Sequence, residues 1–384
     1  MKKHKRLKIG IFCSVEFPVP PSSRMKDIHA PLWLTHFITE ELVKRGHDVT
    51  LFASSDSKTK ARLISEGIIS LPRNKKLSDI YQQIVKIKSQ QLFEKMTLRR
   101  ETINFYEFLL GCKIVKMALE KEFDVLWIEG KKILPLAALC PIPSVIVING
   151  PVDKTKVYLE EYKKRYPQVH FIAISKSQTK PAPDLFTEVA YHGIKIENFP
   201  FNPKPKDYLL FSGQIIHKKG VHLAIQVAKK AKKRLMIIGR HTEDPYWLKE
   251  IKPNLNKNIE YKGFFPYLKV GSVYKDAKAL LMPILWEEPF GLVMIESMAC
   301  GTPVIAFDRG SVREIVKDKE TGFIVKSPNE MIKAVKKLYQ IPGSEYRKMR
   351  ENCRKHIEKN FTIEKMADRY EEIFGKILEK KDNK

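Results

Sequence analysis

Short hydrophobic runs alternate with longer segments of helical periodicity along almost the whole chain. The runs are rich in β-branched and aliphatic side chains, which is typical of buried strands. In the first half of the chain, the expected strands are Leu7–Cys13, Asp48–Ala53, Phe123–Ile128, Ser144–Ile148 and Phe171–Ile174. In the second half, they are Tyr208–Phe211, Leu235–Ile238, Ala279–Pro283 and Val304–Phe307. Strands that alternate with helices predict an α/β protein whose parallel sheets carry helices on both faces.

A proline-rich segment divides this pattern into two parts. Residues 198–206 contain three prolines within six positions, which suit neither a helix nor a central strand. We therefore expect a stiff linker at 198–206 between domains 1–197 and 207–362. Two doubly wound, Rossmann-like domains would face each other across a central cleft, because ligands of such sheets sit beyond the carboxyl ends of the strands.

The C-terminal segment has the pattern of an amphipathic helix. After Thr362, a suitable N-cap, apolar residues recur at helical spacing from Met366 to Leu378. The sequence predicts a helix over 363–384, whose apolar stripe docks either on its own domain or across on the first domain. Residues 82–122 are also expected to be helical.

The chain is strongly basic. Its 70 lysines and arginines exceed its 44 aspartates and glutamates, which leaves a net charge of +26. Residues 1–200 carry 33 basic and 21 acidic side chains, and residues 201–384 carry 37 and 23. This even spread indicates surface lysines rather than a nucleic-acid-binding tail. Peripheral contact with an anionic membrane stays open.

Cysteine spacing and hydropathy favour a cytoplasmic protein. The five cysteines lie at least 28 residues apart, which excludes CxxC redox pairs and suits reduced thiols. No apolar run reaches the ~18 residues of a membrane span, and Leu7–Val15 is too short for a signal peptide. We expect a cytoplasmic location, with attachment at the inner membrane face left open.

No metal or cofactor site is expected. The chain has no Asp-x-Asp, and its ten histidines show neither HxH nor HxxxH spacing. The patterns GxxxxGK[ST] and GxGxxG are also absent. These absences argue against the usual metal, P-loop and dinucleotide sites.

The strongest candidate chemistry lies between Trp286 and Pro303. A loop there leads into a helix predicted over Leu292–Cys300. Gly291 lets a ligand approach the backbone closely, and the N–H groups of a helix start favour an anion such as pyrophosphate.

Two carboxylates flank this helix start. Glu288 lies in the loop, and Glu296 lies eight positions later on the second turn of the helix. Because carboxylates repel phosphate, we expect both to accept hydrogen bonds from hydroxyls, such as those of a sugar and a ribose. The alternatives are that Glu288 caps the helix and that Glu296 is a solvated helix residue.

The pair Glu288-x7-Glu296, within Glu-Pro-Phe-Gly-Leu-x-x-Ile-Glu-x-Met-Ala-Cys-Gly-Thr-Pro, resembles the donor-site signature of the retaining, two-domain (GT-B) glycosyltransferases of group 1, or family 4. The likeness extends through Gly310–Val316 and Thr321–Val325. The resemblance implies a GT-B fold and a nucleotide diphosphate sugar, a UDP-sugar in the first place, as donor.

The same resemblance implies contacts to that donor. Glu288 would hold hydroxyls of the transferred sugar, and Glu296 would hold the ribose. Backbone N–H groups of Phe290, Gly291 and Leu292 would meet the sugar and the phosphate.

A second turn, Ser212 to Val221, resembles the family's Gly-Arg and Lys-Gly turn, whose cations neutralise the leaving diphosphate. Gly213 and Lys219 match this pattern, but Gln214 stands in the arginine position and removes a bidentate positive group. Lys218 is a candidate to replace that charge. Apart from the resemblance, two lysines at a helix start are locally unfavourable unless an anion binds.

The first half should bind the acceptor, and there the likeness is weaker. Residues 40–51 match the family's helix, turn and strand, but His29-Ala30 stands where relatives carry a Gly-Gly loop. Glu129 and Asn149 stand near positions where relatives carry histidines. His29, Glu129 and Asn149 are therefore candidates on the acceptor side, and structural loop roles are the alternative.

The sequence predicts a metal-independent, retaining hexosyltransferase with Glu288 and Lys219 as catalytic residues. The partners would be a nucleotide-sugar donor and a glycosyl acceptor of unassigned identity. The alternative is a catalytically impaired GT-B protein that binds a nucleotide sugar or polyanion without transfer, as Gln214 and the absent glycine loop suggest. Nucleic acid is not an expected partner, because no aromatic or glycine-rich recognition motif accompanies the charge.

Overall fold

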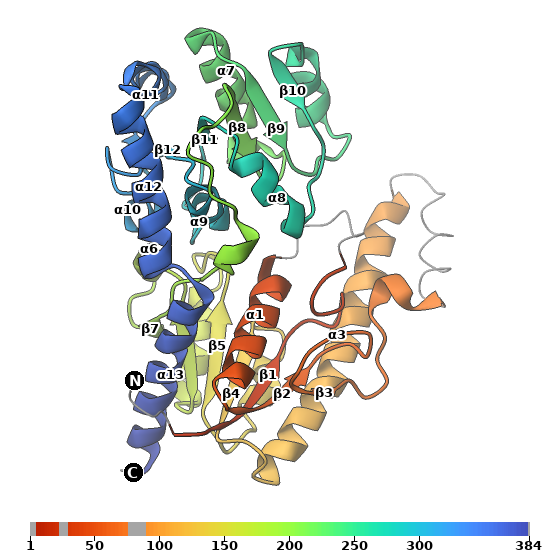
Figure 1. Cartoon of the computed structure of the whole chain (residues 1–384). Helices are drawn as coiled ribbons and strands as arrows, with labels where there is room; N and C mark the ends of the chain where they lie inside the picture. Colours follow the sequence, from red (N-terminus) through yellow and green to blue (C-terminus); the bar gives the residue numbers. More distant parts are fainter. Residues whose placement is uncertain (1–4, 23–29, 76–89, 383–384) are drawn as a thin grey trace.

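The computed structural model describes residues 5–22, 30–75 and 90–382, which form two α/β domains stacked one above the other (Figure 1). The N-terminal sheet has the strand order β3-β2-β1-β4-β5-β6-β7, and every neighbouring pair is parallel. Its strands are β1 (Lys8–Phe12), β2 (Asp48–Phe52), β3 (Arg62–Ile64), β4 (Val125–Glu129), β5 (Ser144–Ile148), β6 (Val169–Ala173) and β7 (Phe186–Val189).

Alternate side chains of this sheet enter two different cores. Ile9 and Ile11 face one way, toward α1 (Ala30–Lys44) and α13 (Ile363–Asp382). Phe12 faces the other way, into a core shared with the helices on the opposite face. Those helices are α3 (Gln90–Leu119), α4 (Leu134–Ala137) and α5 (Lys156–Arg165).

The C-terminal sheet repeats the doubly wound arrangement with the order β10-β9-β8-β11-β12-β13, again all parallel. Its strands are β8 (Leu209–Ser212), β9 (Leu235–Ile238), β10 (Ile259–Tyr261), β11 (Ala279–Met282), β12 (Val304–Phe307) and β13 (Gly322–Val325). Helices α7 (Val221–Ala231) and α11 (Pro328–Gln340) cover one face. The other face packs on α8 (Tyr267–Tyr274), α9 (Leu292–Ala299) and α12 (Gly343–Asn360).

Short helices complete the described chain. They are η1 (Leu71–Arg73), α6 (Lys176–Thr179), η2 (Ile196–Asn198), η3 (His217–Lys219), η4 (Trp247–Ile251), η5 (Lys252–Asn254) and α10 (Val312–Ile315). No helix of the described ranges is long and apolar enough to cross a membrane.

The predicted fold class is confirmed, and each of the nine expected strands is present within two residues of its expected bounds. Four further strands, β3, β7, β10 and β13, were not predicted. All four are the edges of the two sheets, and each is only three or four residues long. β3, β7 and β10 are partly exposed and carry little of the hydrophobic pattern that marks a buried strand, whereas β13 is apolar and mostly buried and its four-residue pattern was overlooked.

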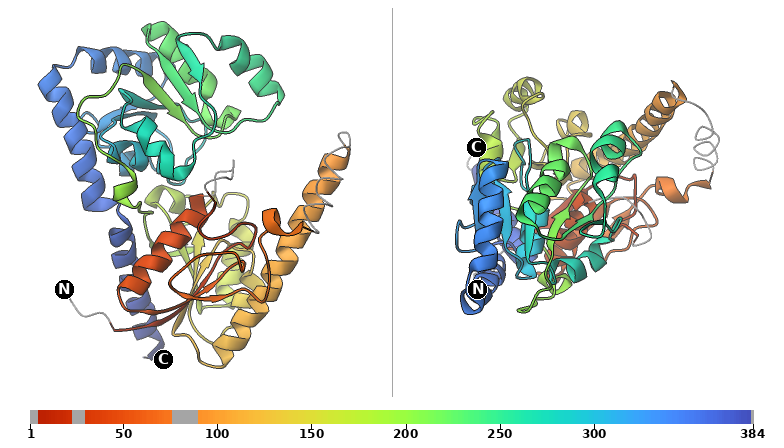
Figure 2. Two further views of the ribbon diagram at one scale, coloured as in Figure 1. Left: turned by 45° about the vertical axis from the view of Figure 1, so that its right-hand side comes forward. Right: turned by 90° about the horizontal axis from the view of Figure 1, so that it is seen from above.

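The C-terminal helix crosses back to the first domain, which decides between the two packings left open by the sequence. Helices α12 and α13 run along one side of both domains (Figure 2). Arg45 Nη1, at the end of α1, donates to Asp368 at 2.8 Å and to Glu371 at 2.5 Å. Tyr370 packs edge-on against Trp127 of β4. The chain therefore connects the domains twice, once through the segment after β7 and once through α13.

Candidate functional site

The loop from β11 to α9 presents a helix start beside the cleft. Gly291 has φ +80° and forms the N-cap of α9. This φ favours glycine, and a Cβ at this position would also lie 2.8 Å from Met294 Cε and 3.0 Å from Met282 Cε, the ends of two flexible side chains that would have to shift. The N–H groups of Leu292 and Val293 have no acceptor within the helix, because they belong to its first turn. This arrangement suits an anion.

Glu288 lies in the same loop, buried to 8 % exposure. Its Oε2 accepts hydrogen bonds from Lys219 Nζ at 2.5 Å and from Trp286 Nε1 at 3.1 Å. The alternative that Glu288 caps the helix is wrong, because Gly291 holds that position and no side chain caps it. Glu288 and Lys219, which the sequence assigned separately, are in direct contact.

Lys219 reaches Glu288 because the turns after β8 and β11 approach closely. Gly220 has φ +73° and ends η3, directly before α7. A Cβ on Gly220 would lie 1.9 Å from the carbonyl oxygen of Pro283, in the β11 turn. Glycine at position 220 therefore sets the distance between the lysine and the carboxylate.

The other candidates of the β8 turn lie around this pair. Lys218 Nζ stands 4.1 Å from the centroid of the Trp286 ring, in a cation–π contact. Gln214 is exposed and lines a cavity of about 180 Å³ together with Gly213, Lys219 and Val293. Gln214 thus faces the space next to Lys219 without supplying a charge.

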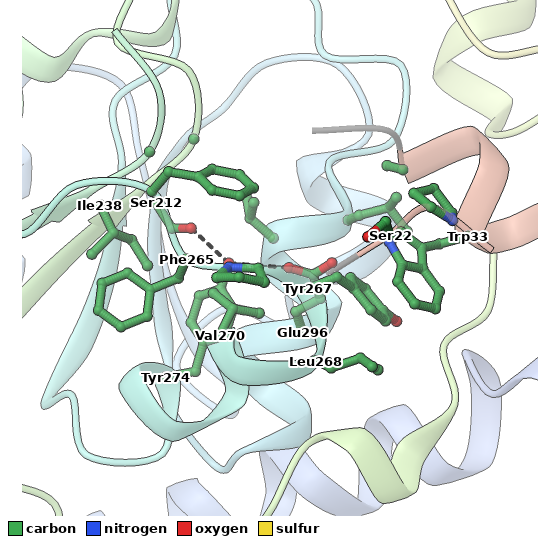
Figure 3. A pocket seen from close by; sticks show the side chains of 18 residues that line it. Ser22, Trp33, Ser212, Ile238, Phe265, Tyr267, Leu268, Val270, Tyr274 and Glu296 are labelled. Carbon is green, nitrogen blue, oxygen red and sulfur yellow. Dashed lines mark hydrogen bonds between the residues drawn. The ribbon is translucent and has the colours of Figure 1, made fainter. Parts of the chain in front are cut away.

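Glu296 is buried on α9, with 7 % exposure. It accepts a hydrogen bond from Tyr274 Oη at 3.1 Å, and Tyr274 Oη lies 2.7 Å from Ser212 Oγ (Figure 3). Burial raises the pKa of Glu296 to about 7, and the Tyr274 hydrogen bond opposes that rise. The alternative of a solvated helix residue is wrong.

Glu296 lines a cavity to which both domains contribute (Figure 3). From the C-terminal domain come Ser212, Gly213, Ile238, Gly239, Phe264, Phe265, Pro266, Tyr267, Leu268, Val270, Tyr274, Leu292, Val293 and Glu296, and from the N-terminal domain Pro21, Ser22, Ala30 and Trp33. Trp33 stacks on Tyr267 across the domain boundary, with ring centroids 5.0 Å apart. Sequence reasoning missed Tyr274, Tyr267 and Trp33, because nothing in the spacing relates them to Glu296.

The carboxyl edge of the N-terminal sheet faces the second domain. Glu314 of α10 accepts hydrogen bonds from the backbone N–H groups of Lys176 and Ser177, both at 2.7 Å, at the start of α6. Helix α6 follows β6 directly, and the strands of this sheet are parallel. Side chains at the ends of β4 and β5 therefore lie at the edge of the sheet that faces the second domain.

Two acceptor-side candidates meet at this edge. Asn149 Nδ2, just after β5, donates to Glu129 Oε1, at the end of β4, at 2.9 Å. Burial raises the pKa of Glu129, and the Asn149 hydrogen bond opposes the rise. A Cβ on Gly130 or Gly150 would meet no atom within 4 Å, so space is open beside both loops. His29 lies outside the described residues.

Glu107 joins this cluster although the sequence analysis did not single it out. It sits on α3 with 1 % exposure, where Ser14 Oγ donates to it at 2.5 Å and Lys132 Nζ at 2.9 Å. Its Oε2 is buried and has no hydrogen-bond partner among the described residues. A signal existed in the sequence, since Glu107 falls in register with the buried Ile103, Leu110 and Ile114 of the inward face of the helix.

Within the described ranges, no group of three or more histidine, cysteine or carboxylate side chains could hold a metal ion. All five cysteines are unpaired, and only Cys112 is exposed.

Comparison with known proteins shows which proteins this chain is similar to. Residues 194–357 match the family model "Glycosyl transferases group 1". A putative glycosyltransferase, YtcC of Bacillus subtilis, is 25 % identical over 244 residues, which cover 55 % of this chain and 60 % of the relative. An uncharacterised glycosyltransferase of Methanocaldococcus jannaschii is 24 % identical over 321 residues, which cover 70 % of this chain and 81 % of that protein.

Solved structures share the whole fold. A glycosyltransferase from Rickettsia africae superposes with a TM-score of 0.71 at 15 % identity, covering 97 % of this chain and 99 % of that one. Sucrose-phosphate synthase from Thermosynechococcus elongatus gives 0.69 at 16 % identity, with the same coverage. HepE of Anabaena in complex with UDP-glucose gives 0.66 at 14 % identity, covering 97 % of this chain and 100 % of HepE. At these identities the likeness concerns the fold.

Proposed function

We propose that this chain, whose residues 194–357 match the model of the group 1 glycosyl transferases, moves a sugar from a UDP-sugar to an acceptor bound by the N-terminal domain. The contact between Lys219 and Glu288 beside the start of α9 carries this proposal. It supplies a cation, helix N–H groups and a carboxylate within one small site, as a negatively charged diphosphate and a hydroxyl-rich sugar require.

Each part of the donor has a complementary group. Lys219 and the first N–H groups of α9 stabilise the diphosphate, both when it binds and as it leaves. Glu288 accepts hydrogen bonds from sugar hydroxyls, and Glu296 accepts them from the ribose. The apolar cavity beside Glu296, with Phe265 and Ile238, accommodates the base. The UDP-glucose bound by HepE favours uridine as that base.

The reaction we propose retains the anomeric configuration and uses no metal. The bond between the sugar C1 and the diphosphate oxygen breaks, the acceptor oxygen forms the new bond to C1 on the same face, and the acceptor proton passes to the leaving phosphate. Lys219 and the fixed N–H dipoles offset the charge that develops on the diphosphate. Domain closure completes the site, since both domains line the cavity.

The acceptor, in this proposal, binds at the carboxyl edge of the N-terminal sheet. Glu129, Asn149 and Glu107 offer carboxylate and amide oxygens there. The unpaired cysteines fit a reducing cytoplasm as the place of action.

Release of nucleotide diphosphate tests the function. The wild-type protein should release UDP from UDP-glucose or another UDP-sugar, slowly without an acceptor, and EDTA should leave the rate unchanged. Glu288→Gln should lower the rate of release strongly, whereas Glu287→Gln should not, because the neighbouring Glu287 pairs with Arg309 and Gly310 instead. Donor binding without release from any UDP-, GDP- or ADP-sugar would support the alternative of a binding protein without transfer, which Gln214 motivates.

A further inference from the structure

Exposed hydrophobic side chains gather on one layer of the N-terminal domain. Of the eleven large hydrophobic residues that are exposed in the described ranges, eight lie on α3, after α4 or on α5. They are Leu98, Phe105, Phe108, Leu109, Leu119, Leu139, Val157 and Tyr158. We call these helices, which cover one face of the N-terminal sheet, the outer helix layer. In Figure 2, α3 runs along the outside of the domain.

Helix α3 is apolar on both of its faces. Its inward side chains, such as Leu110 and Ile114, are fully buried. The outward stripe contains Phe105, 60 % exposed, and Phe108, 51 % exposed. A helix at the surface of a domain ordinarily presents polar residues there, so an exposed stripe of this kind marks an interaction surface.

Contacts between the helices make the layer continuous. A Cβ on Gly111 of α3 would lie 2.4 Å from Leu136 of α4. Lys132, just before α4, pairs with Glu107 of α3, and Lys131 Nζ lies 5.6 Å from the centroid of the Tyr158 ring on α5. The layer is therefore continuous from α3 through α4 to α5, and a lysine lies beside the exposed aromatic ring of α5.

The charge of the layer is positive. The stretches 97–119, 131–139 and 151–165 contain eleven lysines and arginines against five acidic residues. Five of these cations are ion-paired, namely Lys132 with Glu107, Arg99 with Glu16, Lys113 with Glu66, Lys116 with Glu120 and Arg165 with Glu161, and the remaining excess is still positive. Aromatic side chains set among lysines are suited to a lipid surface, since the rings enter the headgroup region and the cations meet lipid phosphates.

We propose that the outer helix layer docks on the surface of an anionic lipid bilayer, with Phe105, Phe108 and Tyr158 inserted among the headgroups. A second copy of the chain fits less well, because a symmetric contact would oppose two positive surfaces. The inference does not depend on sugar transfer.

The native chain carries a reporter for this test. Cys112 lies on α3 and is exposed, whereas the other four cysteines are buried. An environment-sensitive fluorophore on Cys112 should shift to shorter wavelength with vesicles of equal parts phosphatidylcholine and phosphatidylglycerol. It should not shift with phosphatidylcholine alone, and high salt should reverse the shift.

Co-sedimentation with the same vesicles gives the second measurement. Phe105→Ser/Phe108→Ser should lower the partition coefficient roughly tenfold or more. The matched control is Leu248→Ser, since Leu248 is 44 % exposed on the other domain and its loss should not matter. Unchanged circular dichroism and UDP affinity would show that the double variant is folded. Absence of binding to the anionic vesicles, or equal binding by the double variant, would overturn the proposal. A wild-type protein that is dimeric without lipid, together with a monomeric double variant, would overturn it as well.

Discussion

Lys219 and Glu288 are 69 positions apart in the chain and form a direct ion pair between Nζ and Oε2. The lysine side chain is 23 % exposed and the carboxylate 10 %, so the pair sits at the wall of the cleft and not in the core. Trp286 donates to the same carboxylate oxygen, and its ring lies under Lys218 and Lys219. In the absence of donor, the carboxylate and the indole thus hold the lysine in position.

A double-mutant cycle on this pair measures how strongly Lys219 and Glu288 are coupled in the reaction. We expect Lys219→Ala to lower kcat by about 10²- to 10³-fold, because a fixed donor to the leaving diphosphate is lost. Glu288→Gln should also lower kcat, and the double variant should lose less than the product of the two effects, since the residues act together. Single-turnover UDP release measures each variant.

The neighbouring Glu287→Gln serves as the control for that cycle. Glu287 is 69 % exposed, and its carboxylate accepts hydrogen bonds from Arg309 Nη1 at 3.5 Å and from the Gly310 N–H at 2.6 Å, away from Lys219. If the loss of kcat in the double variant equals the product of the losses in the two single variants, Lys219 and Glu288 act independently, which would contradict a shared role.

Glu296 predicts a pH dependence of nucleotide binding. With a pKa of about 7, this carboxyl is mostly protonated at pH 6 and mostly ionised at pH 8. If ionised Glu296 accepts the ribose hydroxyls, the affinity for UDP should rise by roughly tenfold from pH 6 to pH 8. Titration calorimetry at the two values measures it, and Glu296→Gln should remove the dependence. An equal rise in the variant would assign the effect to another group.

The same carboxyl should lower stability as the pH rises. Its pKa is raised in the folded state, so protonation of Glu296 stabilises the fold. This contribution to the free energy of unfolding is complete below about pH 4.5 and is lost as the pH rises through 7. Glu296→Gln should therefore be more stable than the wild type at pH 8, by up to about 3 kcal/mol, and similar to it near pH 4.5. Thermal melting at both pH values tests this, and a variant less stable at pH 8 would be the contrary result.

Gly220 offers a test of how the site is built. Gly220→Ala places a methyl group against the Pro283 carbonyl and should cost several kcal/mol, together with most of the activity. Gly46 is the matched control, because it also has positive φ, +91°, but open space around it. Gly46→Ala should cost only about 1 kcal/mol, from the backbone conformation alone. Equal losses in Tm would show that the close approach at Pro283 does not matter.

The central parts of the fold could be predicted because their strands are buried on both faces. Ser144–Ile148 and Val304–Phe307 are continuous hydrophobic runs, and the structure has the same bounds for both. The edge strand Arg62–Ile64 has no such pattern, since its residues are half-buried or exposed. The packing of α13 could not be derived either, because its stripe suits any apolar surface and the deciding partners, Arg45 and Trp127, lie far away in sequence.

The donor loop was accessible from sequence because its residues are contiguous, and Glu288, Gly291 and Glu296 share a loop and one helix. The contacts that tune them come from elsewhere. Tyr274, which holds Glu296, lies on α8, and Lys219 reaches Glu288 from another strand. Such partners become visible only when the strands are placed side by side.

The ion pairs of Arg45 should contribute to the stability with which α13 packs on the first domain. Arg45→Met leaves the buried Glu371 carboxylate without its guanidinium partner and should cost about 2 to 3 kcal/mol, with a Tm lower by several degrees. Arg165→Met is the control, because the Arg165–Glu161 pair is more than half exposed on both sides and should contribute less than about 0.5 kcal/mol. Differential scanning calorimetry compares them, and equal melting of the two variants would argue against a structural role for the Arg45 cluster.

A substitution of Glu129 should affect transfer to an acceptor and hydrolysis of the donor differently. Because it lies at the end of β4 on the N-terminal side of the cleft, Glu129→Gln should leave UDP release to water within about twofold of the wild type. Transfer to an acceptor should fall by tenfold or more, since a neutral amide replaces the carboxyl group proposed to accept a hydrogen bond from the acceptor hydroxyl. The two rates are measured together, by UDP release and by product formation on a panel of simple sugars.

Asn149→Asp keeps the size of the side chain but places a second carboxylate 2.9 Å from Glu129, and like-charge repulsion should raise the pKa of the pair. Its transfer should then be lost at low pH and recover only as the pH rises. Equal loss of hydrolysis and transfer in both variants would mean that this edge supports the fold and does not bind the acceptor.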